Sequence, residues 1–203
     1  VWMSKNEEVK KKTAQHLQYG RIFGFGLSER EHGADIYSTD MMLKPQAGGT
    51  YLAEGDKYYI GNANQAVIVS TFGKIAGTGE YVFFPVDSHH EKFELVRNVV
   101  ASQMYVAQYN LHDYPIKEEE ILEKGQEAWD ASLNTVNVGK FNLGWATIGI
   151  CTHSFYEAIN HASHRILFGK AVTEFSQVKQ LFVDSYTRLV AMRSTCMRRS
   201  VGA

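Results

Sequence analysis

The hydrophobic pattern of this 203-residue chain changes from strand-like to helical near residue 125. Before that point, short runs rich in aromatic and β-branched residues alternate with turn residues, as in a series of short strands. These runs cover residues 21–27, 65–72, 81–86 and 93–99. From Glu127 onward, apolar residues recur at steps of three and four, which indicates helices. We therefore expect the α+β fold class, with a small β-barrel or sandwich followed by helices.

Three local signals add detail to this expectation. Ser4, with Glu7 three residues later, is the candidate N-cap of a polar helix near the start of the chain. The sequence Glu54-Gly55-Asp56 lies between two strand-like runs and predicts a hairpin turn. Gly169 is the predicted end of the first long helix, because glycine often follows the last turn of a helix.

Composition argues against several classes of function. The formal net charge of −1 gives no electrostatic basis for binding nucleic acid or an anionic membrane. The two cysteines, Cys151 and Cys196, make no disulfide framework and match no zinc spacing. The most apolar run, residues 141–151, is too short to span a bilayer. We expect an intracellular protein with no metal, no nucleic-acid partner and no membrane span.

Two separated segments contain the most specific motifs. The first is F-G-L-S-E-R-E-H-G-A-D at residues 25–35, followed by K-Y-Y-I-G-N at residues 57–62. The second is R-I-L-F-G-K at residues 165–170, followed by E-F-S-Q at residues 174–177. In order and spacing, over about residues 20–193, they resemble the acyl-CoA dehydrogenase family. The family patterns are roughly L-T-E-P-x-x-G-S-D, W-I-T-N and R-x-x-F-G-K-x-x-x-E-x-Q.

This resemblance implies an architecture and a reaction. It implies the end of an N-terminal helical region at residues 1–18, a β-barrel middle domain at 19–124, and the first helices of a C-terminal helical domain at 125–203. The last of these would be antiparallel helices of a truncated helical bundle, and both chain ends would be cuts through a larger protein. The implied function is that of an FAD-dependent oxidoreductase of fatty acid metabolism, which dehydrogenates an acyl-CoA thioester between its α and β carbons. A homo-oligomer, commonly a homotetramer, in the cytoplasm or mitochondrial matrix is implied, and the electron acceptor stays open.

The resemblance also assigns cofactor-binding residues. Ser28 keeps a hydroxyl where the family has threonine, and Tyr59 replaces a tryptophan that covers one face of the flavin ring. Gly61 stands where a hydroxyl residue usually bonds the reactive flavin nitrogen, and Arg165 matches an arginine that meets the FAD of a neighbouring subunit. The full set is Phe25, Leu27, Ser28, Tyr59, Ile60, Gly61, Arg165, Phe168, Ser176 and Gln177.

Each of these assignments can also be explained by an ordinary structural role. Tyr59 suits any strand, and Arg165 suits the C-terminal end of any helix, where a cation complements the macrodipole. Glycines such as Gly24 and Gly26 mark a bulge, a turn, or a place where a ligand or another backbone comes close. The agreement in order and spacing favours the flavin interpretation over these separate ones.

The substrate side departs further from the family pattern. The substrate-binding positions fall on Ala34, Gly139 and Lys140, of which only Lys140 keeps a charge. The reaction needs a carboxylate base. One family position for that base is Gly139 and the other lies beyond Ala203, so the catalytic residue is unknown. Two alternatives therefore stay open: an oxidase or flavin monooxygenase of the same fold, and a non-catalytic fold relative or fragment.

Overall fold

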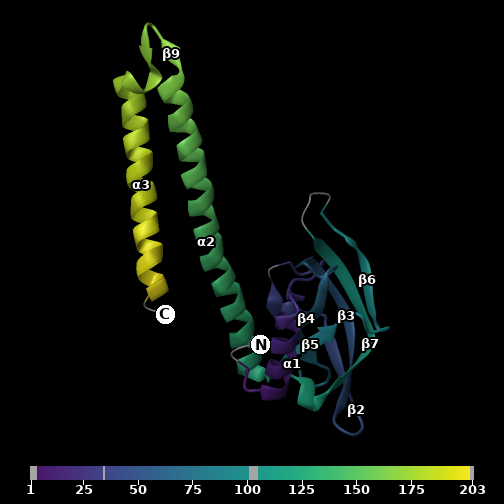
Figure 1. Ribbon diagram of the computed structural model, residues 1–203. Coiled ribbons are helices and arrows are strands. Elements are labelled where there is room, and N and C mark those ends of the chain that lie inside the picture. The colour runs from purple at the N-terminus through teal and green to yellow at the C-terminus, as the bar shows by residue number, and fades with distance from the viewer. Residues whose placement is uncertain (1–3, 34, 101–104, 202–203) are drawn as a thin grey trace. The chain divides into compact units, whose positions relative to one another are not determined.

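The structure is a computed structural model that describes residues 4–33, 35–100 and 105–201. The chain forms two compact units, Val1–Thr135 and Val136–Ala203. The first unit contains an eight-stranded sheet and the second is helical (Figure 1). The expected α+β class, with a sheet-rich region followed by helices, is confirmed. Among the described residues, no helix combines the length and apolar character that a membrane span requires.

The first helix, α1, spans Glu7–Gln18 and is capped by Asn6, whose side chain accepts a hydrogen bond from the Val9 amide. The predicted N-cap, Ser4, is therefore wrong by two residues. The Ser4 hydroxyl instead donates to the carbonyl oxygen of Leu122 at 3.0 Å, so it is already used to attach this segment to the sheet region. Sequence alone could not show that distant partner.

The sheet of the first unit has the order β6-β7-β3-β2-β4-β5-β8, and β1 pairs in parallel with β4. The described strands do not pair β6 with β8, so the structure is consistent with the sandwich form of the prediction rather than with a closed barrel. The strands are β1 Ile22–Gly26, β2 Met42–Gln46, β3 Thr50–Gly61, β4 Ala66–Ile75, β5 Tyr81–Asp87, β6 Phe93–Asn98, β7 Val106–Lys117 and β8 Glu123–Lys124.

The predicted hairpin turn at Glu54-Gly55-Asp56 is wrong, because β3 runs through it without a break. Gly55 has φ of +143° and lies at a register shift in the β3–β7 ladder. A side chain on Gly55 would place its Cβ only 2.9 Å from the Cα of Met41. The glycine therefore allows a bulge and a close backbone approach within one strand. The hairpin between β2 and β3 turns instead at residues 47–49.

Two hydrophobic clusters stabilise the first unit. The larger one lies between the strands and includes Met41, Val69, Phe84 and Tyr109, each with no exposed surface. The smaller one packs α1 and the start of the long helix α2 (Gly125–His164) onto the sheet, and is made of Val9, Phe72, Phe83, Leu122 and Ala128. Because β4 contributes to both clusters, nearly all of its residues are buried. The end of β1 is held between these clusters.

The second unit consists of the later part of α2 (Gly125–His164) and α3 (Ser176–Val201), joined by a small hairpin of β9 (Ile166–Leu167) and β10 (Lys170–Ala171) (Figure 1). Gly169 does not end the helix, which stops at His164. Phe168 and Gly169, with φ of 51° and 80°, form the turn of the hairpin instead. Two successive residues with positive φ suit a two-residue turn between twisted strands.

Candidate functional site

A cleft of about 600 Å³ lies at the C-terminal end of β1. Two segments form most of its wall: the end of β1 with the residues after it, and the end of β3. The lining residues are Phe23, Gly24, Phe25, Leu27, Ser28, Tyr59, Ile60, Gly61, Ser70, Phe83 and Thr135. Six of the ten predicted cofactor-binding residues are in this set, although the two segments are about 30 residues apart in sequence. We refer to it below as the β1 cleft.

Two hydrogen bonds join the two walls of the β1 cleft, one between backbone groups and one from a side chain to a carbonyl oxygen. The Tyr58 amide donates to the carbonyl oxygen of Ser28 at 3.0 Å, and the Ser28 hydroxyl donates to the carbonyl oxygen of Tyr58 at 2.6 Å. A register shift between Lys57 and Ile60 makes a bulge here, with Tyr59 at φ of 62°. Tyr59 is 62% exposed, so its ring is available to a ligand. The hydroxyl of Ser28 keeps only its accepting capacity for a ligand.

The glycines of β1 serve the core. A Cβ on Gly26 would lie 2.2 Å from the hydroxyl oxygen of Tyr109, and one on Gly24 would lie 3.2 Å from a methyl of Val69. The partners that come close are therefore core side chains, where sequence reasoning expected a ligand or another backbone. Gly61 differs from both, since an added Cβ would meet no atom within 4 Å.

A buried ion pair lies directly behind the β1 cleft, and sequence reasoning did not identify it. The Lys57 ammonium has no exposed surface and donates to a Glu29 carboxylate oxygen at 2.6 Å and to the carbonyl oxygen of Leu27 at 3.0 Å. Glu29 also accepts from the Thr39 hydroxyl and from the Asp40 amide at 2.7 Å. Burial alone would raise the pKa of Glu29, but the Lys57 charge and these hydrogen bonds hold it below its ordinary value.

Glu29, His32 and Asp40 present ligand atoms within 4.8 Å of one another, a spacing that suits a metal ion. The Glu29 oxygens already accept from Lys57, Thr39 and the Asp40 amide, so a cationic partner is present in the protein itself. His32 bonds Asp40 at 2.6 Å, and this hydrogen bond raises the pKa of His32. The arrangement is therefore explained as a hydrogen-bonded loop anchor.

The other four predicted cofactor-binding residues lie together around the hairpin of the second unit. The Arg165 carbonyl accepts from the Val172 amide, which closes the hairpin, and Phe168 at its turn is 94% exposed. Ser176 begins α3, and its hydroxyl donates to the side-chain oxygen of Gln177 at 3.2 Å. Arg165 and Phe168 are both exposed, so each is available to a ligand or another chain.

Two of the three predicted substrate-binding residues lie in the part of the chain that the structure describes. Gly139 and Lys140 are exposed on α2 within the second unit. Ala34 lies outside the described residues. Their roles stay predictions.

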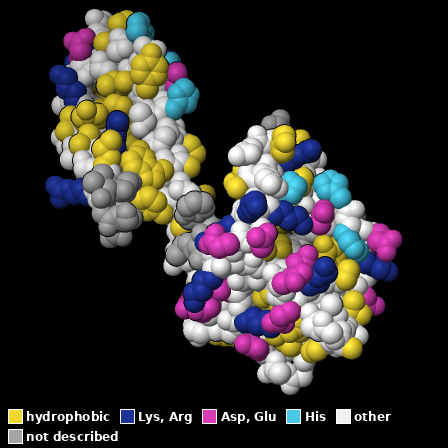
Figure 2. All heavy atoms as spheres, turned by 60° about the horizontal axis from the view of Figure 1, so that its bottom comes forward, with side chains coloured by type: hydrophobic (Ala, Val, Ile, Leu, Met, Phe, Trp, Pro, Cys, Tyr) yellow, Lys and Arg dark blue, Asp and Glu magenta, His cyan; other side chains and the backbone are white. Residues whose placement is uncertain are grey.

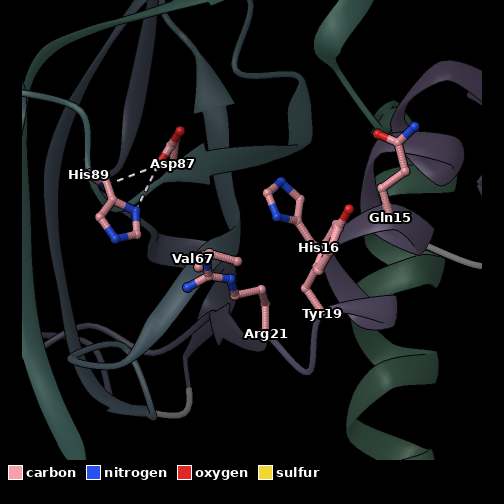
Figure 3. Close-up of a pocket in the computed structure, with 7 residues that line it drawn as sticks. All are labelled: Gln15, His16, Tyr19, Arg21, Val67, Asp87 and His89. Atoms are coloured by element: carbon pink, nitrogen blue, oxygen red, sulfur yellow. Dashed lines mark hydrogen bonds and ion pairs between the residues drawn. The ribbon is translucent and has the colours of Figure 1, made fainter.

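A separate polar hollow of about 370 Å³ lies at the opposite end of β1 (Figure 3). His16 and Tyr19 reach it from the end of α1, and His89 lies across from them with its amide bonded to Asp87 at 2.9 Å. His16 lies in the last turn of α1, and Arg21 follows the helix, where its cationic side chain can complement the exposed carbonyls of the helix C-terminus. This hollow contains none of the predicted cofactor residues.

Comparison with known proteins agrees with the motif and the fold. Residues 127–202 match the family described as acyl-CoA dehydrogenase, C-terminal domain. An acyl-CoA dehydrogenase of Bacillus subtilis (strain 168) is 26% identical over 197 residues, which cover 93% of this chain and 51% of the relative. The chain spans about half the length of the curated relatives it matches.

Two solved structures have the same fold. Butyryl-CoA dehydrogenase from Megasphaera elsdenii has a TM-score of 0.86 at 21% identity, covering 97% of this chain and 53% of that one. An acyl-CoA dehydrogenase complexed with FAD from Bacillus anthracis has a TM-score of 0.85 at 22% identity, covering 95% and 34%. The fold is therefore that of the acyl-CoA dehydrogenases. Residues 127–202 also match the C-terminal domain of that family, and the curated relatives are similar to the chain along most of its length.

Proposed function

We propose that this chain is part of an FAD-dependent oxidoreductase that dehydrogenates an acyl-CoA thioester between its α and β carbons. The observation that supports this most strongly is the convergence of six motif residues on the β1 cleft. The relatives agree, since one structure is a complex with FAD and the others are named for acyl-CoA or butyryl-CoA.

The residues of the β1 cleft fit a flavin ring. Tyr59 offers an exposed aromatic side chain on which a flat ring can stack. Ser28 can accept a hydrogen bond from a ring N–H, and the open side of Gly61 allows the ring to approach the backbone. Phe25 and Leu27 supply apolar wall. When bound, FAD would supply a ring that accepts hydride from the substrate.

The hairpin of the second unit would serve the polar part of a cofactor. Arg165 offers a forked donor that suits a pyrophosphate. Phe168, with nearly all of its side chain exposed, would pack against the same ligand or the subunit that holds it. We propose, from the family resemblance, that this ligand is the FAD of a neighbouring subunit in a homo-oligomer. Ser176 and Gln177 would contact its adenine side.

By the family resemblance, the residues that would contact the substrate are Ala34, Gly139 and Lys140. Lys140 is exposed, so its charge is available to an anionic or carbonyl-bearing substrate. Gly139 has no side chain with which to abstract a proton, so the base must come from another position.

The test is the reductive half-reaction of the protein expressed from its whole coding sequence. Its absorption spectrum is recorded, and saturated acyl-CoA thioesters of increasing chain length are then added without oxygen. We expect flavin bands that bleach with at least one thioester. Flavin bands that none of them bleaches would favour the oxidase or monooxygenase alternative. Protein that binds no flavin, even with added FAD, would contradict the proposal and favour the non-catalytic one.

A further inference from the structure

Among the residues that the structure describes, one lysine, Lys57, is completely buried, which is unusual for that residue type. Lys57 lies within β3, opposite Tyr109 of β7, and its side chain has no exposed surface. Placing an ammonium in the interior costs free energy unless a partner of opposite charge and further hydrogen bonds compensate for the lost water. Glu29 provides the charge, so the remaining question is what this buried pair holds in place.

The hydrogen bonds of Lys57 fall on both sides of one cleft residue. Its ammonium donates to the carbonyl oxygen of Leu27 and to the carboxylate of Glu29, the residues immediately before and after Ser28. Glu29 in turn accepts from the amide of Asp40. One buried cation therefore fixes the segment from which Leu27 and Ser28 line the β1 cleft.

Lys57 also lies next to the other wall of the β1 cleft. The bulge that exposes Tyr59 begins directly after Lys57, at the register shift between Lys57 and Ile60. The amide of Tyr58, the next residue, donates to the Ser28 carbonyl oxygen, and the Tyr58 carbonyl oxygen accepts from the Ser28 hydroxyl. The Lys57 side chain is hydrogen-bonded to the wall that contains Leu27 and Ser28, and the Lys57 backbone continues into the wall that contains Tyr59. A substitution at Lys57 therefore affects both walls of the β1 cleft.

We propose that Lys57 is a positioning residue, whose buried ammonium holds Leu27 and Ser28 in the place from which they meet a cofactor in the β1 cleft. The cofactor part of this inference rests on the proposed function. The structural part, that Lys57 fixes the contact between Ser28 and Tyr58, stands on the hydrogen bonds alone.

The test separates positioning from general stability with two variants, both made in the protein expressed from its whole coding sequence. Lys57→Met leaves the Glu29 carboxylate buried without its cation, which should destabilise the fold. Adding Glu29→Gln removes that charge while keeping an oxygen for the Asp40 amide, so the double variant should recover most of the lost thermal midpoint. Lys44→Met and Glu54→Gln, on the exposed pair between β2 and β3, are the matched controls.

Two readouts are then compared in the double variant. We expect FAD to bind at least about ten-fold more weakly than to the wild type, and the Tyr58 amide to exchange at least about ten-fold faster, since one hydrogen-bond anchor is lost. The controls should change neither readout by more than about two-fold. If FAD affinity and Tyr58 exchange recover together with the midpoint, Lys57 is merely structural and the proposal is overturned.

A third measurement uses only the wild-type protein, so it does not depend on whether a variant folds. In the wild-type protein, the Tyr58 and Asp40 amides should exchange as slowly as the amide of Phe84 in the core strand β5. Exchange at Tyr58 about a hundred-fold faster than at Phe84 would overturn the proposal, because Lys57 would then not be fixing the strand end. A wild type that binds no FAD would contradict the proposed function only, and the exchange results would still decide the role of Lys57.

Discussion

Gly26 shows how a single missing side chain can determine local packing. A Cβ at this position would lie 2.2 Å from the hydroxyl oxygen of Tyr109, which is fully buried and shares a 2.7 Å hydrogen bond with Thr71. We predict that Gly26→Ala lowers the free energy of unfolding by about 1–3 kcal/mol, because an overpacked core must shift. Urea unfolding measures this, with Gly61→Ala as the control that should change it by less than about 0.5 kcal/mol. Equal effects at both positions would contradict the packing described here.

The carboxylate of Glu29 predicts a specific dependence of stability on pH. Its folded-state pKa is held below the ordinary value of 4.5, despite the opposing effect of burial. A lowered pKa contributes stability above the unfolded-state value, and this contribution is lost as pH falls through the folded-state value. The difference in unfolding free energy between wild type and Glu29→Gln should therefore be largest near neutral pH and shrink below about pH 4.5. A difference that stays constant over that range would contradict the ion-pair account.

At the scale of elements, the hairpin between the two helices of the second unit depends on Gly169. Because its φ is 80°, replacement by alanine forces a side chain into a left-handed conformation. We predict that Gly169→Ala lowers the thermal midpoint, at a cost of about 1 kcal/mol. Gly139→Ala, inside α2 with open space around it, should instead raise the midpoint by a similar free energy. A stabilising Gly169→Ala would show that the turn differs from the one described.

Strands and helices were easier to predict from the sequence than the residues at which they end or the residues they contact. The spacing of hydrophobic residues was enough to locate most strands and helices, because it shows which face of each element is buried. The error at Gly55 arose because a bulge glycine and a turn glycine look alike locally, and only the nearby Met41 backbone distinguishes them. Lys57 was missed for a similar reason, since its partner Glu29 is 28 residues away. The six predicted cofactor-binding residues that line the β1 cleft came from the family resemblance, not from local pattern, and their role in binding a cofactor stays a prediction.

At the scale of the whole molecule, the two units differ in how much apolar surface they cover. The first unit buries two hydrophobic clusters. In the second, hydrophobic side chains gather over the helices, as Figure 2 shows, and Leu143, Ile150 and Leu181 are each about two-thirds exposed. Surfaces of this kind mark contacts with other protein segments. The chain spans about half the length of the curated relatives it matches.

An FAD titration of the wild type and two tyrosine variants tests most directly whether a flavin binds in the β1 cleft. Tyr59 lines the β1 cleft, while Tyr19 is similarly exposed at the polar hollow beyond the other end of β1. We predict that Tyr59→Ala weakens FAD binding about ten-fold through lost ring stacking, and that Tyr19→Ala leaves it within about two-fold. FAD binding that Tyr59→Ala leaves unchanged, or that Tyr19→Ala weakens instead, would contradict the account.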